Sequence, residues 1–228
     1  MLTRRRALYN NRLQKEPIFF APLDMDLLPT IAWNGDKTIY KNIGYSMDGE
    51  CYSGTSTSNV LLYNCSIPSE KTDLTFSCWI KPTVSMGTIG YAFGATTKNR
   101  EIGKGCHFCC SNSTYRLDTE WTRIVQASIP AITIGEWQFI TFTIKKTDSG
   151  WSRKIYKNGI LEYEADGQIK NDNNRNPYSG FQDCFFAIGN GSSNGAKNVY
   201  YKHFSCFDAL TDDEVLALYS NNGVPILP

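Results

Sequence analysis

The amino-acid sequence predicts an all-β protein built as a β-sandwich, with one short helix near its C-terminus. Three observations lead to this prediction. Many segments alternate apolar and polar residues with a period of two, which is typical of strands because successive side chains point to opposite faces of a sheet. Clusters of Gly, Asn, Asp and Pro separate these segments, as in sandwiches of many short strands. A strong helix-start signal lies late in the chain, at residues 211–214.

The clearest strand lies in the stretch from Gly135 to Gly167, around which the rest of the chain is organised. Residues 136–144 alternate and are rich in β-branched and aromatic side chains, which favour a pleated surface. One face carries Ile140, Phe142 and Ile144, and the other carries Trp137, Phe139, Thr141 and Thr143. Neither face is fully polar, so we expect an inner strand of a curved sheet rather than a solvated edge.

A hairpin is predicted in the second half of this stretch. Asn158-Gly159 lies between two alternating segments, and this dipeptide favours a type I′ turn because both central residues need a positive φ. A two-residue loop would place Ile155 opposite Glu162 and Arg153 opposite Glu164. We therefore expect a cross-strand ion pair between Arg153 and Glu164 on a solvated face.

The other elements follow from the same signals. The remaining strands are expected, in chain order, at residues 17–23, 60–63, 74–81, 90–94, 106–115, 122–129, 184–188 and 199–207. Polar segments predict loops at residues 24–58, 171–180 and 189–198. The helix is expected to begin after Thr211, which forms a capping box with Glu214, and to end at Gly223 and Pro225.

Length and charge limit the function classes. The 228 residues are within the length of one large all-β domain. The net charge of +1 argues against a global attraction to nucleic acid or to an acidic membrane surface. No apolar run approaches the roughly 18 residues of a membrane span. We therefore expect neither nucleic acid nor a membrane as a partner, and we expect no cofactor.

A basic arm at residues 1–16 precedes the predicted domain at residues 17–228. The cations of the arm are Arg4, Arg5, Arg6, Arg12 and Lys15. The start resembles that of a signal peptide, but the apolar stretch of about 7–15 residues is missing, so we expect no export signal. Such an arm is usually a solvated tail, and the alternative that we favour is a segment that docks on a partner surface.

The eight cysteines are even in number, which is compatible with disulfides. Because no export signal is visible and the chain is large, we expect free thiols instead. Cys78, Cys184 and Cys206 lie within apolar alternating segments, where a free cysteine behaves as a small buried hydrophobic residue.

Four segments resemble laminin G-like, concanavalin A-type jelly-roll domains. Residues 76–82 (FSCWIKP) resemble the family's aromatic strand that ends in Trp-Val-Lys-Pro, and residues 135–140 (GEWQFI) resemble its Gly-x-Trp strand. Residues 155–159 (IYKNG) are similar to its Tyr-x-Asn-Gly hairpin, and residues 204–219 to its closing strand and helix. The matches follow the family's order over roughly residues 17–222. The resemblance implies a concanavalin A-like fold, which hosts lectins, sugar-binding modules, glycoside hydrolases, lyases and inert virion or adhesin domains.

Two catalytic or metal-binding patterns are candidates within this fold. Laminarinase-type members carry Glu-x-Asp-x-Glu on one strand, and Glu162, Glu164 and Asp166 have this spacing in a different order. The hairpin ion pair explains these acids more simply, so we expect no catalysis there. Cys106, His107, Cys109 and Cys110, with His203 and Cys206, could supply zinc ligands, although strand alternation favours core thiols for this set.

Calcium and glycans are the remaining candidate ligands. Calcium is common in the family, and Asp24 and Asp26 are weak candidates that turn formation explains equally well. Glycan binding needs exposed aromatic rings beside amides and charges. The residues that meet this description in polar loops are Trp121, Trp151, Asn174, Arg175 and Tyr178. The alternative is that these rings pack loops down, with Trp79 and Trp137 in the core.

These observations together favour a non-enzymatic virion structural protein, namely a bacteriophage head-fibre, decoration or tail-fibre component. Such a protein is made in the host cytoplasm and reaches the outside by assembly and lysis, without a signal peptide. The arm is expected to dock on capsid or tail proteins while the jelly roll projects, with host-surface or environmental glycans as candidate ligands. Fibres are usually symmetric, so we expect a homotrimer or homodimer. The alternatives are a bacterial carbohydrate-binding module or adhesin, and a glycoside hydrolase.

Overall fold

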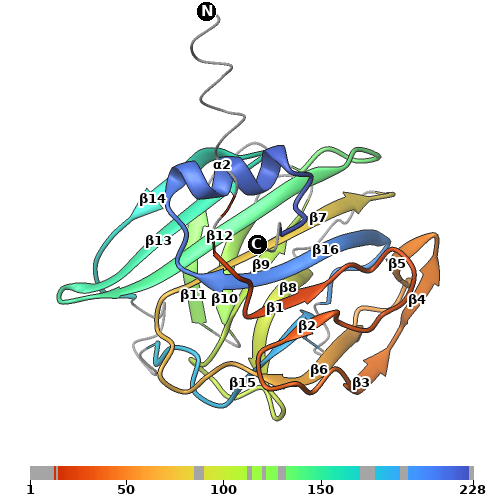
Figure 1. The fold of residues 1–228 in the computed structure, drawn as a ribbon, viewed down its shortest axis with the longest axis horizontal. Coiled ribbons are helices and arrows are strands. Elements are labelled where there is room, and N and C mark those ends of the chain that lie inside the picture. The colour runs from red at the N-terminus through yellow and green to blue at the C-terminus, as the bar shows by residue number, and fades with distance from the viewer. Residues whose placement is uncertain are drawn as a thin grey trace, which may run out of the picture.

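The computed structural model describes residues 13, 15–84, 90–111, 115–119, 122–127, 132–169, 178–190 and 195–225. These residues form two antiparallel sheets packed face to face, with a helix on the outer face of one sheet (Figure 1). The predicted β-sandwich with a C-terminal helix is confirmed. Among the described residues, no helix is both long and apolar enough to span a bilayer.

Sheet A has the strand order β14-β13-β12-β7-β16-β1-β2. In addition, β5 pairs with β16, and β4 pairs with β5. Its strands are β1 (Phe19–Ala21), β2 (Ile31–Ala32), β4 (Tyr45–Asp48), β5 (Glu50–Ser53), β7 (Leu74–Pro82), β12 (Gln138–Thr147), β13 (Gly150–Lys157), β14 (Ile160–Ala165) and β16 (Val199–Asp208). Sheet B has the order β11-β10-β9-β8-β15-β6-β3. Its strands are β3 (Ile39–Ile43), β6 (Val60–Ser66), β8 (Gly90–Thr97), β9 (Cys106–Cys110), β10 (Tyr115–Thr119), β11 (Thr122–Ala127) and β15 (Cys184–Gly189).

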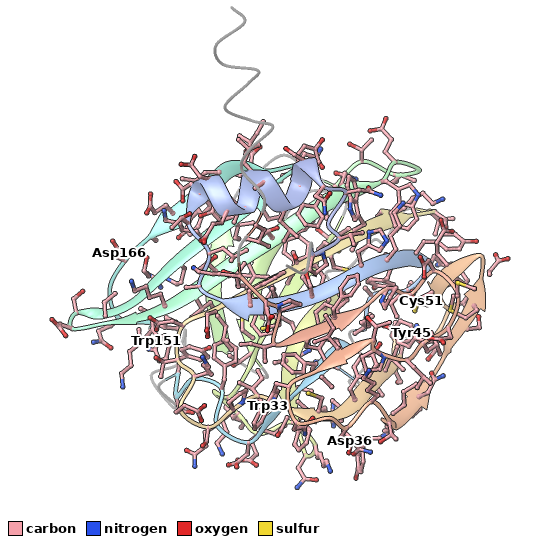
Figure 2. The ribbon with its side chains drawn as sticks, viewed as in Figure 1. Trp33, Asp36, Tyr45, Cys51, Trp151 and Asp166 are labelled. Atoms are coloured by element: carbon pink, nitrogen blue, oxygen red, sulfur yellow. The ribbon has the colours of Figure 1, made fainter. Side chains whose placement is uncertain are left out.

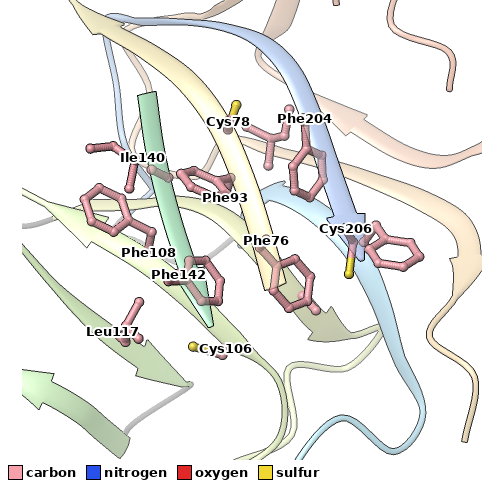
Figure 3. Close-up of a cluster of buried hydrophobic side chains, with 14 of the residues drawn as sticks. Phe76, Cys78, Phe93, Cys106, Phe108, Leu117, Ile140, Phe142, Phe204 and Cys206 are labelled. Carbon is pink, nitrogen blue, oxygen red and sulfur yellow. The ribbon is translucent and has the colours of Figure 1, made fainter. Parts of the chain in front are cut away.

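Aromatic side chains fill the space between the sheets (Figure 3). Phe19 of β1 stacks on Phe186 of β15 with ring centroids 4.4 Å apart, which joins sheet A to sheet B. Phe76 and Phe142, on neighbouring strands of sheet A, stack at 4.9 Å. Offset stacking of this kind adds to the free energy gained by burying the rings. The core therefore fixes which face of every strand points inward.

Strand β12 is the inner strand that the alternation predicts, because it pairs with β7 on one side and β13 on the other. Ile140, Phe142 and Ile144 point into the core between the sheets. Phe139 points the opposite way, into a second cluster under the helix. Both faces of the strand are thus covered, which explains why neither is polar in the sequence.

The helix, α2 (Asp212–Ser220), packs on the outer face of sheet A. Thr211 and Glu214 form the predicted capping box, in which each side chain accepts from the other residue's backbone N–H. Val215 and Leu218 are buried against Phe139 and Phe207. The helix therefore covers only part of the outer face of sheet A.

The eight cysteines are free thiols, and all of them are buried. Cys78, Cys184 and Cys206 lie in the core between the sheets, as predicted. Burial disfavours the thiolate and raises the pKa of Cys110 to about 12.

The predicted register of the β13–β14 hairpin is wrong by one residue. The turn itself is confirmed, because Asn158 and Gly159 have φ values of 52° and 77°. A β-bulge then makes Glu162 an extra residue, so that Lys154 and not Arg153 lies opposite Glu164. The ion pair joins Lys154 Nζ to Glu164 Oε1 at 3.3 Å.

Two other boundaries differ from the prediction. The segment predicted as a loop at residues 24–58 contains the short strands β2, β3, β4 and β5, which Gly and Asp turns separate so closely that no alternation is visible. The strand predicted at 106–115 ends at Cys110, and Tyr115 begins β10. Residues 171–177 and 191–194 of the predicted loops at 171–180 and 189–198 lie outside the described residues.

The hairpin turn gives a testable prediction. A Cβ at Gly159 would lie 3.0 Å from Tyr219 Cδ1 and 3.1 Å from Leu216 Cδ1, whereas a Cβ at Gly49, whose φ is +74°, would meet nothing within 4 Å. We expect Gly49→Ala to lower the free energy of unfolding by about 1 kcal/mol, through backbone strain alone. Gly159→Ala should cost about 2–3 kcal/mol, because it also crowds α2. Urea denaturation of both variants measures the difference, and equal losses would contradict the packing of the turn against the helix.

Candidate functional site

The predicted glycan-binding aromatics are mostly buried. Trp151 is 8% exposed and Tyr178 is 6% exposed, and their rings meet edge to face with centroids 4.7 Å apart (Figure 2 labels Trp151). The prediction that these two rings face a ligand is therefore wrong, because their apolar area closes one end of the core. Trp121, Asn174 and Arg175 lie outside the described residues.

The acids of the hydrolase candidate lie on the edge strand β14 and just beyond it. Glu164 is bound by Lys154, whose Nζ also lies 2.9 Å from Asp212 Oδ1 of α2. Asp212 also accepts a hydrogen bond of 2.8 Å from Tyr156, and these contacts hold the pKa of Asp212 below its usual value. Glu164 thus belongs to a network that ties the hairpin to the helix.

The zinc candidates are not brought together by the fold. Cys106, Cys110 and Cys206 point into the core, and His107 lies on the opposite face of β9. His203 Nδ1 lies 2.7 Å from the carbonyl oxygen of Asn222. The described residues contain no group of three or more His, Cys, Asp or Glu that could hold a metal ion. Of the calcium candidates Asp24 and Asp26, both exposed, Asp26 accepts the backbone N–H of Leu28 in a turn.

The outer face of sheet B carries a buried polar group that the sequence did not predict. His107 of β9 is 2% exposed and lies opposite Asp118 of β10 in the strand register. Asp118 forms an ion pair with Arg116. Burial lowers the pKa of His107 to about 4. The imidazole is therefore neutral in the folded protein near pH 7.

A second aromatic group is partly exposed on the outer face of sheet A. We name it the lysine–aromatic surface; it consists of Tyr52, Trp79, Lys81, Trp137, Tyr200 and Lys202. Strand register assembles it: Tyr200 of β16 lies opposite both Lys81 of β7 and Tyr52 of β5. Lys202 lies opposite Trp79 in the same way. Trp137 immediately precedes β12, so strands distant in the sequence contribute to one surface.

The lysines of this surface lie over aromatic rings. Lys202 Nζ is 4.4 Å and Lys81 Nζ is 4.9 Å from the ring centroid of Trp137. Lys81 Nζ is also 4.8 Å from the ring of Tyr200. Cation–π contacts at these distances hold flexible lysine side chains in place at a partly exposed site. The result is a surface on which aromatic rings and positive charges lie side by side.

Hydrogen bonds at the rim fix the rings. The Tyr200 hydroxyl donates to Asp48 Oδ2 at 2.7 Å, and the Tyr52 hydroxyl donates to Asn198 Oδ1 at 3.0 Å. Trp79 Nε1 donates to the carbonyl oxygen of Asn222 at 2.9 Å. Neither Trp79 nor Trp137 lies in the core between the sheets, because both side chains are on the outward face and only partly buried. Trp79 packs against the hydrophobic cluster under α2. Strand alternation could have located Trp79, Lys81, Tyr200 and Lys202 on outward faces, but not their pairing.

The last residues of the predicted arm contact the domain. Leu13 is 5% exposed and packs in the cluster under α2. Lys15 Nζ lies 3.0 Å from Glu214 Oε2 and donates to the carbonyl oxygen of Ala209 at 2.9 Å. Arg4, Arg5, Arg6 and Arg12 lie outside the described residues. The chain thus joins the domain at the N-terminal end of α2, whereas Trp79 contacts Tyr219 near its C-terminal end.

Two packed sheets with an aromatic outward surface define a lectin-like jelly roll. A sequence profile of the concanavalin A-like lectin/glucanases superfamily matches residues 53–215, and the chain belongs to this superfamily. No curated protein sequence matches the chain.

Solved structures with the same fold include binding domains and enzymes. The binding domain of botulinum neurotoxin serotype D has a TM-score of 0.63 at 14% identity, covering 90% of this chain and 51% of that one. Trypanosoma rangeli sialidase has a TM-score of 0.63 at 8% identity, covering 90% and 33%. A heptameric pentraxin from Limulus polyphemus has a TM-score of 0.50 at 18% identity, covering 68% and 73%. The chain spans about half of the toxin binding domain, and at these identities the likeness concerns the fold alone.

The buried imidazole gives a prediction for pH. The pKa of His107 is lower in the folded chain than the 6.5 of a free histidine, so the unfolded chain binds more protons below pH 6.5. Stability should therefore decrease as the pH falls from 6.5 towards 4, by roughly 3 kcal/mol from this group.

Replacing His107 by Gln should remove this part of the slope. His203→Gln should leave it in place and remove only the separate contribution of His203, whose pKa burial also lowers. Urea denaturation at several pH values between 4 and 7 measures the slopes. Equal slopes for wild type and His107→Gln would show that the imidazole is not buried in its neutral form.

Proposed function

We propose that this chain is a non-enzymatic, carbohydrate-binding jelly roll of a bacteriophage virion, which contacts glycans through the lysine–aromatic surface and docks on the particle through its N-terminal arm. The observation that carries the proposal is the partly exposed ring of Trp137, which lies within 5 Å of the ammonium groups of both Lys81 and Lys202. Sugar rings present apolar C–H faces that pack on flat aromatic side chains, while polar groups beside the ring bind their oxygens. A surface that combines both features suits a saccharide.

The cysteines and the arm support the virion part of the proposal. Eight buried free thiols suit a chain that folds in a reducing compartment. The contacts of Leu13 and Lys15 join the arm to one end of α2, and the lysine–aromatic surface lies near the other end. An arm that docks on capsid or tail proteins would therefore leave the ligand surface accessible. A homotrimer or homodimer is part of this proposal, since virion fibres are usually symmetric.

The contacts of the candidate catalytic acids make the hydrolase alternative weaker than carbohydrate binding. Glu164 is engaged by Lys154 in the network that joins the hairpin to α2, so it is not poised to attack a saccharide. A bacterial carbohydrate-binding module or adhesin would use the same surface, and the role of the arm distinguishes it from a virion protein.

Removing the central ring tests carbohydrate binding. We expect Trp137→Ala to weaken binding to any glycan retained on an array by about tenfold or more, equivalent to at least about 1.4 kcal/mol. The matched control is Trp33→Ala (Figure 2 labels Trp33), because Trp33 is 50% exposed, follows β2, and donates to the carbonyl oxygen of Ser66 on sheet B. Isothermal titration with the retained glycan gives both constants. Equal affinity in wild type and Trp137→Ala would refute a binding role for this surface.

Truncating the arm tests the virion role. Deleting residues 2–12 keeps Leu13 and Lys15, so the free energy of unfolding should change by less than about 0.5 kcal/mol. We expect the truncated chain to be missing from virus particles purified from producing cells, as judged by immunoblotting. A variant with Arg4, Arg5, Arg6 and Arg12 all replaced by Gln tests whether charge is responsible. Normal incorporation of the truncated chain would contradict docking through the arm.

A further inference from the structure

The acceptors and the lysine ammonium groups of the lysine–aromatic surface differ in their contacts within the protein. Three acceptors beside the surface each already accept one hydrogen bond from its rings: Asp48 from Tyr200, Asn198 from Tyr52, and the Asn222 carbonyl from Trp79. The cations are not engaged in this way. Neither Lys81 nor Lys202 forms an ion pair with any residue that the structure describes. What the surface offers a ligand is therefore two lysine charges that no carboxylate of the described residues pairs with, beside acceptors that are each already in use.

The two lysine charges without ion-pair partners favour one class of ligand. A lysine ammonium group has three donors and no acceptor. A neutral sugar hydroxyl is both donor and acceptor, so a site for neutral saccharides needs free acceptors as well as donors. A carboxylate or sulfate group is acceptor-only and charged, and its hydrogen bonds to an ammonium group are about twice as strong as neutral ones. We propose, resting on the proposed carbohydrate function, that the lysine–aromatic surface binds acidic saccharides that carry carboxylate or sulfate groups.

The arrangement of the two charges supports a saccharide over a more extended polyanion. Lys81 and Lys202 both lie over the one ring of Trp137, at 4.9 and 4.4 Å, so the cations and the stacking surface form a single compact unit. A charged substituent of one sugar bound beside Trp137 could therefore contact either ammonium group. Nucleic acid recognition uses a run of phosphate contacts along a basic groove, whereas the chain as a whole has a net charge of only +1.

A second lysine provides a matched control on the other sheet. Lys98 Nζ lies 4.2 Å from the ring of Tyr40 and 4.6 Å from that of Phe185. It is thus another lysine stacked between rings, but on the outer face of sheet B. Replacing Lys98 by Gln removes one lysine charge from the protein, against two in a double variant of Lys81 and Lys202, without touching the lysine–aromatic surface.

The test is an array of matched oligosaccharide pairs: uronic acid oligosaccharides with their carboxyl-reduced forms, and sulfated oligosaccharides with their desulfated forms. We expect the full chain to bind the acidic member of at least one pair about tenfold more tightly than its neutral partner. In the double variant Lys81→Gln, Lys202→Gln this preference should disappear, and in Lys98→Gln it should remain. Raising the salt concentration should weaken binding of the acidic member more than binding of its neutral partner.

The other outcomes separate this inference from the proposed function. Equal binding of acidic and neutral members that is lost in Trp137→Ala would keep the carbohydrate function and overturn the acidic ligand. Acidic binding that survives the double lysine substitution would also overturn the inference. A twenty-nucleotide single-stranded DNA could instead bind more tightly than the saccharides, through the same lysines. That result would identify nucleic acid, and not an acidic saccharide, as the ligand. Binding of no pair member at all would overturn both proposals.

Discussion

Face-to-face packing of aromatic rings between two sheets is the constraint on which the rest of the structure depends. Phe19 and Phe186 join the sheets directly, and Phe76 stacks on Phe142 beside them. Successive residues of a strand point to opposite faces. A residue whose ring lies in the core therefore has neighbours in the strand whose side chains point outward. Strand β7 buries Ile80 in the core and therefore turns Lys81 outward, and β16 does the same with Tyr201 and Lys202. The ligand surface is thus a consequence of the core.

The helix divides the outer face of sheet A into two regions with different roles. Under α2 the sheet presents Phe139 and Phe207, and the helix buries them with Val215 and Leu218. Beyond the C-terminal end of α2 the sheet presents the lysine–aromatic surface. Glu214 in the first turn of the helix binds Lys15, which joins the arm to the domain. One short element therefore covers an apolar region, binds Lys15 at one end, and contacts the edge of the lysine–aromatic surface at the other.

Local sequence patterns correctly predicted the elements that neighbouring residues determine. The type I′ turn at Asn158-Gly159, the capping box at Thr211 and the inner strand β12 depend on neighbouring residues, and all three are confirmed. The bulge at Glu162 was not predictable, because a turn fixes the register only of the residues next to it. Trp151 and Tyr178 were misassigned because polar neighbours in sequence do not measure burial. The lysine–aromatic surface needs the pairing of β5, β7 and β16, which no local pattern contains.

The most direct measurement for the central claim is a two-dimensional nuclear magnetic resonance titration that follows the indole N–H signals of the five tryptophans. An acidic oligosaccharide is added in steps to the uniformly ¹⁵N-labelled full chain. The account predicts that the signals of Trp137 and Trp79 shift with saturation, while those of Trp33 and the buried Trp151 stay in place. Shifts confined to Trp33, Trp121 or Trp151, with Trp137 unchanged, would contradict it.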